Sequence, residues 1–560
     1  MAEMTGGEAL VAQLIAEGIG DLFLLPGVQL DWATDALRRA QDQIRCFIPR
    51  HEQTTAYMAD GYARTTGKVG AFMVVPGPGL LNTMAALSTA YACNSRVLAI
   101  SGHIASHGIG KGAGLLHEIN NQDEVLASVT KWNARPKSMV EIPSLVREAV
   151  RQLNTGRPMP VGLEVPHDLL SARGNAQIIE PPAGERESGR LAPDERDIQV
   201  AAEMLNGAQF PIIYVGGGVL ASGASEALKD LAERLDAPVV MSENGRGALS
   251  DRHPLALNAV GGRAVFPRAD VVLVVGSRFI DTLTGKAALE RGNSNYIFLN
   301  VDAAVFTDPR SPSATIASDA KLGLEALANA VRSRPRTIAP TLDRVRAWVA
   351  LQTQILTPQM EWLHALRTAI PDEGILINEL TQVGYVARSH YPVYRPRTYI
   401  SPGYQGTLGY GFPTALGVAV GNPDKVVVGI TGDGGFGWNL QELATAARYN
   451  LNLVQIVFND GRFGNVRTLQ RAAFGESFGD ELTNPDFRKL ADAFGVRYDR
   501  VSEPHDLAAA ISAARREGGP TLIDAPVEAM PSPWHLMRLN PPPPGTPVPP
   551  DPFEAEGQAT

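Results

Sequence analysis

Strand-length apolar runs that alternate with helical stretches recur along the whole chain, and this rhythm limits the fold more than any other feature. One run reads Gly70-Ala-Phe-Met-Val-Val-Pro, and comparable runs begin at Pro211 and Lys425. Apolar runs of this length are typical of strands buried on both faces of a parallel sheet. The 560 residues also exceed what one hydrophobic core usually organises. The sequence therefore predicts an α/β protein with three doubly wound domains and mostly parallel sheets.

Two polar stretches that contain proline divide the chain, one over residues 180–189 and the other over residues 332–341. They predict domains over residues 1–180, 190–335 and 355–536. Residues 537–560 include the run Asn540-Pro-Pro-Pro-Pro, which forms neither helix nor sheet and predicts an extended, polyproline-like tail. The sequence leaves open whether this tail is a disordered end or a strap over the active site.

Composition excludes several classes of partner. The net charge of −9 disfavours nucleic acid and anionic membranes, because both attract basic surfaces. Two cysteines, Cys46 and Cys93, are too few for a disulfide framework. The chain does not open like a signal peptide, and no apolar run approaches the ~20 residues that span a bilayer. We therefore expect a cytoplasmic protein with no nucleic-acid or membrane partner.

One stretch of the last domain combines a glycine turn with acidic residues at two strand ends. A strand expected to end at Thr431 is followed by Gly432-Asp433-Gly434-Gly435 and by a helix expected over residues 439–449. The next strand is expected to end at Phe458, directly before Asn459-Asp460. Because parallel strands end at the same edge of a sheet, we expect the acidic residues to lie close together. Hard oxygen ligands from two strand ends, beside a diphosphate, would complete a Mg²⁺ site.

Two further segments are less informative when each is taken alone. The glycine-rich loop Gly403-Tyr-Gln-Gly-Thr-Leu-Gly enters a helix of small residues, whose N-terminus would suit a phosphate. Leu408 in this loop reads as an ordinary core leucine. Glu52 opens a helix expected over residues 51–65, where a glutamate usually does no more than complement the helix dipole.

Together these segments resemble the thiamine-diphosphate-dependent enzymes, in the branch that holds acetolactate synthase, pyruvate oxidase and pyruvate decarboxylase. The stretch Gly432-Asp433-Gly434 with Asn459-Asp460 is similar to the family's Gly-Asp-Gly…Asn-Asn signature, with an aspartate in place of the second asparagine. Arg50-His-Glu, followed by Ala59-Asp-Gly-Tyr-Ala-Arg, resembles the element that carries the cofactor-activating glutamate. The resemblance covers about residues 5–536 and implies pyrimidine-binding, central and diphosphate-binding domains in that order.

The resemblance also implies roles for individual residues. Mg²⁺ would be held by the side chains of Asp433 and Asp460 and by the main-chain carbonyl of Arg462. Glu52 would push the pyrimidine ring into its imino tautomer, a task that suits a carboxyl in an apolar pocket. Leu408 would hold the two cofactor rings in a bent conformation. Further contacts with thiamine diphosphate are implied for Pro76, Gly77, Asn82, Gln405, Gly406, Thr407, Gly432, Gly434, Gly435, Phe463 and Gly464.

Residues that read the substrate are sought in a polar, glycine-rich loop and at the end of the last domain. In the loop, His117 and Gln122 resemble an element near the cofactor of acetolactate synthases, and we predict catalytic roles for both. The alternative is that they are polar residues of a surface loop. Trp534 and His535 either line a lid or anchor the C-terminus.

The central domain raises the question of a second cofactor. Val215-Gly-Gly-Gly is a weak phosphate-loop signal, because the full dinucleotide fingerprint is missing. Gly276-Ser-Arg-Phe and Asn300-Val-Asp resemble positions that hold FAD or ADP in some relatives, whereas other relatives hold nothing there. FAD, ADP or coenzyme A, and no nucleotide at all remain three alternatives.

These expectations combine into one leading function and two alternatives. The leading one is an acetolactate-synthase-like lyase or carboligase that uses thiamine diphosphate and Mg²⁺ on a 2-oxo acid or an acyloin. The first alternative is a 2-hydroxyacyl-CoA lyase or an oxalyl-CoA-decarboxylase-like enzyme. The second, a flavin or nicotinamide oxidoreductase, would leave Glu52 and the Asp433–Asp460 pair unexplained. The family arrangement implies a homodimer or homotetramer with active sites at the subunit interface.

Overall fold

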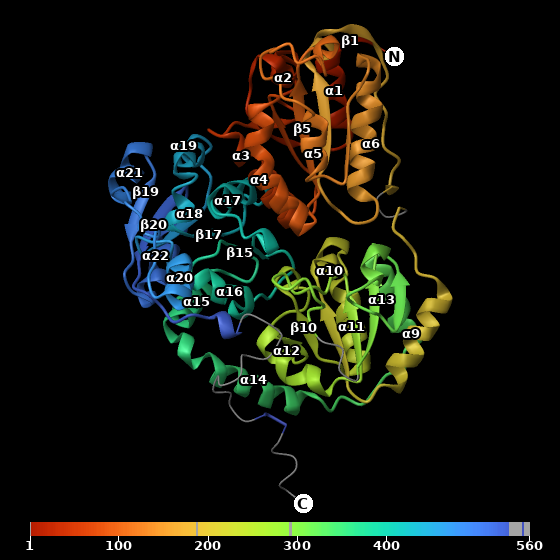
Figure 1. The fold of residues 1–560 in the computed structure, drawn as a ribbon, viewed down its shortest axis with the longest axis vertical. Helices are drawn as coiled ribbons and strands as arrows, with labels where there is room; N and C mark the ends of the chain where they lie inside the picture. Colours follow the sequence, from red (N-terminus) through yellow and green to blue (C-terminus); the bar gives the residue numbers. More distant parts are fainter. Residues whose placement is uncertain (1, 186–188, 290–293, 537–550, 554–560) are drawn as a thin grey trace, which may run out of the picture.

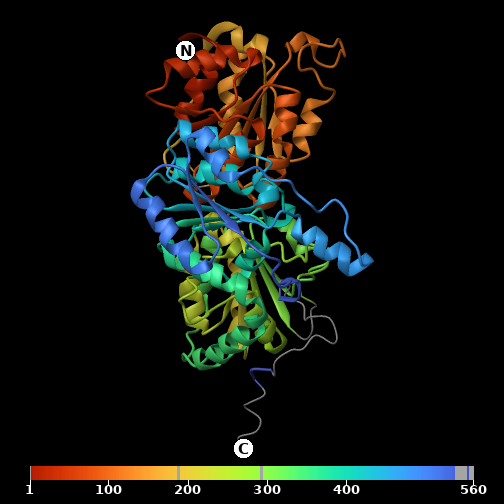
Figure 2. The same ribbon diagram turned by 90° about the vertical axis from the view of Figure 1, so that its left-hand side faces the viewer.

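Three six-stranded sheets, each parallel throughout, form the framework of the protein (Figure 1). The computed structural model describes residues 2–185, 189–289, 294–536 and 551–553. Within them, no helix is both long enough and apolar enough to span a bilayer. The structure confirms the predicted α/β fold class with mostly parallel sheets. Figure 2 shows the C-terminal domain in front, with the N-terminal domain above it and the central domain below it.

The N-terminal sheet has the strand order β3-β2-β4-β5-β7-β6. A separate antiparallel pair, β1 with β8, joins the two ends of this domain. Its strands are β1 (Ala2–Thr5), β2 (Asp21–Leu24), β3 (Arg45–Phe47), β4 (Gly70–Val74), β5 (Val97–His103), β6 (Trp132–Ala134), β7 (Val161–Pro166) and β8 (Arg173–Ala176). Its helices are α1 (Gly6–Ala16), α2 (Asp31–Arg39), α3 (Glu52–Thr66), α4 (Pro78–Cys93), α5 (Gln122–Ala127), α6 (Ile142–Asn154) and α7 (His167–Ser171).

The C-terminal sheet repeats this topology. Its order is β16-β15-β17-β18-β20-β19, so both sheets read 2-1-3-4-6-5 when strands are numbered within each six-stranded sheet. Its strands are β15 (Ile375–Asn378), β16 (Tyr399–Ile400), β17 (Val427–Gly432), β18 (Val454–Asn459), β19 (Arg497–Arg500) and β20 (Thr521–Pro526). Its helices are α15 (Thr357–Ala369), α16 (Gln382–His390), α17 (Gly411–Gly421), α18 (Asp433–Phe436), α19 (Leu443–Arg448), α20 (Gly464–Phe474), α21 (Phe487–Phe494) and α22 (Pro504–Glu517).

The central sheet has a different order, β11-β10-β9-β12-β13-β14, which reads 3-2-1-4-5-6 and is the order of dinucleotide-binding folds. Its strands are β9 (Pro211–Val215), β10 (Val239–Met241), β11 (Ala256–Leu257), β12 (Val271–Val275), β13 (Asn295–Asn300) and β14 (Ala314–Ala317). Its helices are α9 (Glu195–Gly207), α10 (Gly217–Ser222), α11 (Ser225–Leu235), α12 (Ala259–Val265) and α13 (Ala320–Ala330). Helix α14 (Ala339–Thr353) leads from it to the C-terminal domain (Figure 1).

Helices α3 and α17 pack the N-terminal domain directly onto the C-terminal domain. A Cβ at Gly417 would lie only 2.0 Å from the carbonyl oxygen of Met58, and one at Gly61 only 2.5 Å from that of Thr414. These glycines therefore allow the two backbones to touch. The contact belongs to one hydrophobic core that runs through both domains.

The two faces of the C-terminal sheet belong to two different hydrophobic cores. Ile375 and Ile377 of β15 belong to the core continuous with the N-terminal domain, whereas Leu376 between them belongs to the core continuous with the central domain. This follows from the alternation of side chains across a strand. Each face of this sheet therefore contributes to a core that continues into a different neighbouring domain.

The helix expected over residues 439–449 is shorter than predicted. A 3₁₀ turn, η9 (Leu440–Glu442), leads into α19, which begins at Leu443. Asn439 leaves helical geometry, and its Nδ2 donates a 2.8 Å hydrogen bond to the carbonyl oxygen of Gly409. The side chain thus ties this segment to the glycine-rich loop instead of extending the helix.

Most of the predicted tail lies outside the described residues, so its two interpretations stay predictions. The described part, residues 551–553, places Phe553 in a buried position against Phe210, with ring centroids 6.2 Å apart. The guanidinium of Arg268 lies 4.1 Å from the centre of the Phe553 ring. This end of the chain therefore contacts the central domain.

Candidate active site

The carboxyl ends of β17 and β18 carry the acidic pair that was predicted for the metal. Asp433 begins α18 directly after β17, and Asp460 directly follows β18. The Oδ2 atom of Asp433 accepts a 2.6 Å hydrogen bond from Nδ2 of Asn484. The Oδ2 atom of Asp460 accepts a 3.0 Å bond from Nε2 of Gln382. Both carboxylates are thus fixed by neutral amide groups.

The electrostatics of the pair favour a cation. Burial raises the pKa of Asp433, and burial together with the charge of Asp433 raises the pKa of Asp460 to about 6. A divalent cation would stabilise both ionised forms. The described residues contain no group of three or more His, Cys, Asp or Glu side chains placed to hold a metal ion. An ion here would therefore also need main-chain and ligand oxygens, as the predicted Mg²⁺ site does.

Arg462 lies beside the pair. Its backbone N–H donates a 3.2 Å hydrogen bond to Oδ1 of Asp460, which holds this stretch of main chain next to the carboxylates. Its guanidinium points to Glu481, at 3.0 Å, so the side chain has a structural partner. A Cβ at Gly464 would lie 2.8 Å from Oδ2 of Asp460, which explains the glycine at this position.

Asn484 is a site residue that the sequence prediction missed. Its Nδ2 bridges Asp433 and Asn459, at 2.6 and 3.1 Å. It comes from a polar segment well beyond the predicted signature, and no periodicity or motif marks it. Only the folded structure reveals this partner, which lies in the loop before α21.

A buried glutamate, Glu379, connects the two glycine-rich segments of the C-terminal domain. It follows β15, and its two carboxyl oxygens accept hydrogen bonds from the N–H groups of Gly409 and Gly411, at 2.9 and 2.7 Å. A Cβ at Gly435 would lie 2.0 Å from its Oε1 atom. Burial raises the pKa of Glu379 to about 7, although the two backbone bonds oppose this shift. The sequence prediction missed Glu379, whose only signal was an acid directly after an apolar strand.

The predicted residues of the glycine-rich loop lie at its surface or are partly covered. Leu408 is half-buried. The next residue, Gly409, donates its backbone N–H to the carboxyl group of Glu379. The Thr407 hydroxyl bonds that of Thr89 at 2.7 Å, whereas Gln405 and Gly406 are exposed. The open side of this loop therefore fits a bound group.

On the N-terminal side, Glu52 is the first residue of α3 and is half-buried. Its Oε2 atom accepts a 3.0 Å hydrogen bond from Nδ2 of Asn82, which lies on α4. A Cβ at Gly79 would lie 3.8 Å from Oε1 of Glu52, so the start of α4 passes beside the carboxyl group. The structure thus brings two of the predicted cofactor contacts together.

The turn before α4 collects the remaining residues predicted on this side. Gly77 has a φ of 56°, its N–H donates a 2.8 Å hydrogen bond to Oε1 of Gln122, and the preceding Pro76 is buried. Nε2 of Gln122 donates to Oε1 of Glu164 at 2.9 Å. Both ends of the Gln122 amide are therefore occupied within the chain. His117 lies beside the same turn, because a Cβ at Gly77 would be 2.2 Å from its carbonyl oxygen.

The two sides are connected through a residue outside the site. Glu442 accepts hydrogen bonds from the backbone N–H of Arg50 and the hydroxyl of Thr54, across the interface of the two domains. Among the described residues of a single chain, no hydrogen bond or ion pair joins Glu52 to Asp433 or Asp460. Each domain therefore presents one half of the site.

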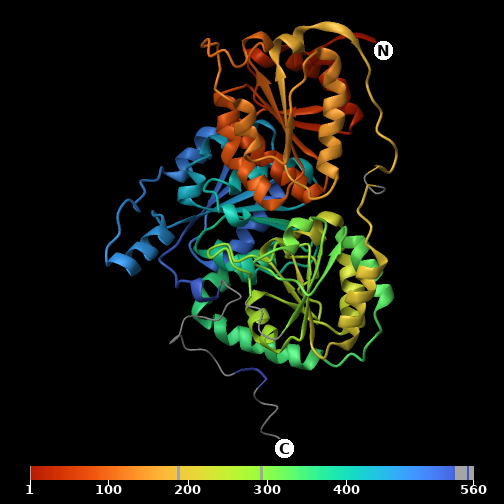
Figure 3. The same ribbon diagram turned by 45° about the vertical axis from the view of Figure 1, so that its right-hand side comes forward.

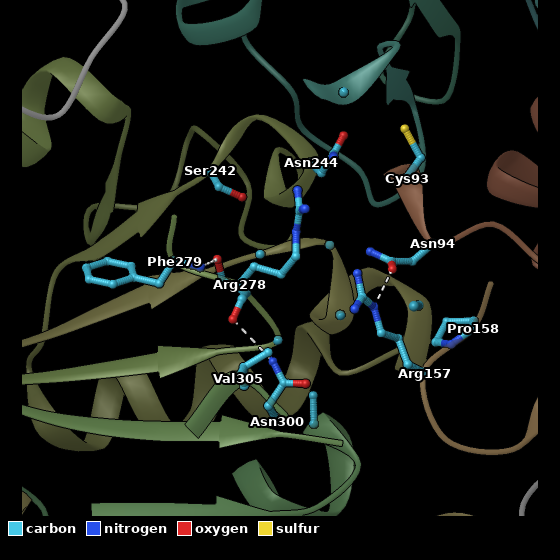
Figure 4. A pocket seen from close by; sticks show the side chains of 18 of the residues that line it. Cys93, Asn94, Arg157, Pro158, Ser242, Asn244, Arg278, Phe279, Asn300 and Val305 are labelled. Atoms are coloured by element: carbon cyan, nitrogen blue, oxygen red, sulfur yellow. Dashed lines mark hydrogen bonds between the residues drawn. The ribbon is translucent and has the colours of Figure 1, made fainter. Parts of the chain in front are cut away.

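A cavity of about 360 Å³ lies at the junction of all three domains (Figure 4). Arg157 donates a 2.7 Å hydrogen bond to Oδ1 of Asn94, and the guanidinium of Arg278 lies 4.2 Å from the centre of the Tyr404 ring. The cavity is also lined by Arg96, Arg190 and Arg388. Arg190 and Arg388 are paired with Asp319 and Glu243, which also line the cavity. An anionic ligand would therefore rely mainly on the remaining arginines.

The triple-glycine turn at the edge of this cavity has a packing explanation. Cβ atoms at Gly216 and Gly218 would lie 2.4 and 2.7 Å from the backbone of Gly276. These glycines let two strand ends of the central sheet approach each other. The turn therefore gives no independent support to a dinucleotide-dependent oxidoreductase.

The end of the last domain is anchored to its own domain. Nε1 of Trp534 donates a 2.8 Å hydrogen bond to Oδ1 of Asn465, and its ring packs on Tyr385 with centroids 5.1 Å apart. Burial lowers the pKa of His535. These contacts favour the anchor interpretation over the lid.

Comparison with known proteins adds an independent finding. The chain matches family models described as thiamine pyrophosphate enzyme N-terminal TPP binding domain (residues 4–125), central domain (residues 198–327) and C-terminal TPP binding domain (residues 380–525). It is 33% identical to a probable 2-ketoarginine decarboxylase of Pseudomonas aeruginosa, over 93% of this chain and 94% of that protein. It is 32% identical to a probable acetolactate synthase large subunit of Methanococcus aeolicus, over 96% and 94%. It is 30% identical to the acetolactate synthase isozyme 1 large subunit of Escherichia coli, over 94% of each chain.

Proposed function

Since the chain belongs to the thiamine-diphosphate-dependent enzymes, in the branch of acetolactate synthase and pyruvate oxidase, we propose that it breaks or forms the carbon–carbon bond next to the carbonyl of a 2-oxo acid or an acyloin. The observation that carries this proposal is the pair of complementary half-sites, Glu52 on one domain and Asp433 with Asp460 on the other. The relatives named for 2-ketoarginine and acetolactate favour a 2-oxo acid donor.

Within the proposal, each side of the site has its own task. When bound, thiamine diphosphate supplies the electron sink that lets a bond next to a carbonyl break. Asp433, Asp460 and the carbonyl of Arg462 would hold Mg²⁺ and, through it, the diphosphate. Glu52 holds the proton that activation of the pyrimidine ring requires, and Asn82 orients its carboxyl group. Leu408, fixed through Gly409, supports the bent cofactor.

His117 and Gln122 keep places in the proposal, but their tasks differ. His117 is the candidate for proton exchange with the substrate. The amide of Gln122 is already bonded at both ends, so it supports the Gly77 turn and contacts no substrate.

The arginine-lined cavity supports a nucleotide site as a second part of the proposal. FAD and the ADP portion of coenzyme A both carry phosphates, which suit a cavity lined by arginines such as Arg278. Binding of ADP, coenzyme A and FAD, measured by calorimetry on the purified protein and on Arg278→Met, tests it. Coenzyme A binding would favour a thioester substrate and so the 2-hydroxyacyl-CoA lyase or oxalyl-CoA-decarboxylase-like alternative. No binding by any of the three ligands would contradict a nucleotide site.

We propose a homodimer or homotetramer, because no hydrogen bond or ion pair among the described residues of a single chain joins the Glu52 half of the site to the Asp433–Asp460 half. Helix α20, which follows Asp460, projects from the C-terminal domain with no buried residue (Figure 3). Its side chains Leu469 and Phe474, and Phe478 just beyond it, are exposed apolar residues. Such a surface is typical of a protein interface. Light scattering at micromolar concentration measures the mass, and a monomeric active enzyme would contradict the assembly.

The function itself is tested by detecting covalent intermediates. The protein, loaded with thiamine diphosphate and Mg²⁺, is incubated briefly with pyruvate, longer 2-oxo acids, acyloins or 2-hydroxyacyl-CoA thioesters. Proton NMR after acid quench then identifies any adduct on the cofactor. An adduct with a 2-oxo acid or acyloin supports the proposal and names the donor. Bound cofactor with no adduct from any of these would contradict it.

A further inference from the structure

His117 lies in a strained backbone conformation on the Glu52 side of the site. Its φ is 67°, in the left-handed region that a histidine seldom adopts. Its carbonyl oxygen packs against the Gly77 turn, from which α4 leads past Glu52 to Asn82. The backbone of His117 and the carboxyl group of Glu52 therefore pack against the same short segment, at Gly77 and at Gly79.

Gln29 is the residue that orients this imidazole. It lies in the 3₁₀ turn η1 (Val28–Leu30), which follows β2, and is only 6% exposed. Its Nε2 lies 3.1 Å from the carbonyl oxygen of Leu116, and its Oε1 lies 3.0 Å from Nδ1 of His117. The buried amide thus spans two neighbouring groups of the loop.

The two bonds together decide where the proton of the ring lies. Only the NH₂ group of Gln29 can donate to the carbonyl of Leu116, so the amide oxygen faces His117. An amide oxygen accepts and cannot donate, so Nδ1 must carry the hydrogen of the neutral ring. Nε2 then keeps its lone pair.

The Nε2 atom has room to use that lone pair. No residue of the described ranges is placed to hydrogen-bond it. Two neighbouring side chains are exposed: Val28, which precedes Gln29, by 64%, and Leu116, which precedes His117, by 63%. This part of the loop is therefore open to solvent, and Nε2 is left for a substrate to contact.

We propose that Gln29 is a positioning residue that fixes His117 as the Nδ1–H tautomer, so that Nε2 accepts the proton of a substrate hydroxyl near Glu52. The O–H bond of the substrate breaks, its proton binds Nε2, and Nδ1–H stays hydrogen-bonded to Gln29 in the resulting imidazolium. The proton returns by the reverse step. The catalytic part rests on the proposed function, whereas the tautomer is a property of the chain alone.

The tautomer is tested without any activity. Neutron diffraction of deuterated crystals, grown above the titration range of the ring, shows deuterium positions directly. We expect deuterium on Nδ1 of His117 and none on Nε2. Deuterium on Nε2 with a bare Nδ1 would overturn the proposal, whatever the substrate proves to be.

The coupling of the two residues is tested by a double-mutant cycle on the loaded enzyme. We expect Gln29→Met to lower kcat about 10- to 100-fold, because the ring loses its fixed tautomer, with little change in the affinity for thiamine diphosphate. Gln29→Glu keeps an acceptor for Nδ1–H and should recover most of kcat. In a His117→Ala background, Gln29→Met should cause no further loss.

A matched control separates positioning from stability. Gln13 is also buried in the N-terminal domain, and its amide exchanges two 2.8 Å hydrogen bonds with the backbone of Ile179. Gln13→Met should lower stability but leave kcat per folded molecule unchanged. The coupling would be refuted if the effects of Gln29→Met and His117→Ala on the activation free energy simply added. It would also be refuted if Gln29→Met kept full kcat. An inactive wild-type protein would instead point to failure of the proposed function, and the neutron result would still decide the tautomer.

Discussion

The N-terminal and C-terminal domains share one strand order, yet their sheet edges carry different chemistry. On the N-terminal edge, Glu52 is half-buried and accepts one side-chain hydrogen bond, from Asn82. On the C-terminal edge, Asp433 and Asp460 lie within a network of amide donors that includes Asn484 and is closed by neighbouring glycines. The same topology thus presents two kinds of acid. One is lightly restrained and can exchange a proton, and the other is a rigid pair that can bind a cation.

The largest effect is expected at the lightly restrained acid. Glu52→Gln keeps the shape and the contact with Asn82 but removes the proton that the group holds. Turnover should fall about 100- to 10,000-fold, the usual range for loss of a general acid or base. The affinity for thiamine diphosphate, measured by calorimetry, should change little. Unchanged turnover would remove Glu52 from the activating role.

The opposite pattern is expected at the rigid pair. Asp433→Asn removes one of the two charges that would face Mg²⁺, so the affinity for thiamine diphosphate with Mg²⁺ should fall about 100-fold, the upper end of what one charged ligand contributes. Calorimetry at several Mg²⁺ concentrations measures this loss, and excess Mg²⁺ should restore part of it. Equal affinities of variant and wild type would show that the pair holds no metal.

A third test uses the buried acid that supports the C-terminal edge. The pKa of Glu379 is raised from 4.5 to about 7, so the folded protein binds its proton more tightly than the unfolded chain does. Its contribution to stability is therefore full below pH 4.5 and is lost as the pH rises to 7, about 3 kcal/mol in total. Glu379→Gln does not titrate.

Urea unfolding of the cofactor-free protein at pH 5 and pH 7.5 measures this change. The free energy of unfolding of the wild type should fall by about 2 kcal/mol more than that of Glu379→Gln over this range. Because other acids titrate in both proteins, only the difference between the two is informative. A difference that does not depend on pH would show that Glu379 is not protonated at pH 5 in the fold.

The smallest effect is expected at the edge of the rigid network. Asn484→Ala removes the donor that bridges Asp433 and Asn459 and leaves the charges in place. A loss of about 10-fold in the affinity for thiamine diphosphate with Mg²⁺ is expected, as for partners that orient metal ligands. A loss as large as that of Asp433→Asn would mean that Asn484 itself contacts the bound group.

Sequence patterns predicted the fold class and the juxtaposition of Asp433 with Asp460, because buried parallel strands have a strong apolar signature and their ends share one edge. They did not reveal Asn484 or Glu379. Those two residues act through single hydrogen bonds to distant segments, and such bonds leave no periodic trace in the sequence. The predicted start of this helix at residue 439 was wrong for the same reason, because the side chain of Asn439 hydrogen-bonds the carbonyl oxygen of Gly409 across the fold.

The two-sided burial of the C-terminal sheet has a consequence for protein engineering. Residues that alternate along β15 belong to cores completed by the N-terminal domain on one face and by the central domain on the other. Excised from the chain, this domain would expose apolar surface that its neighbours now cover, such as the face of α17 that packs on α3, so we expect it to be less stable alone than in the full-length chain. Directed evolution of the loops that carry Asp433 and Asp460 is therefore better carried out in the full-length chain, where these contacts are kept.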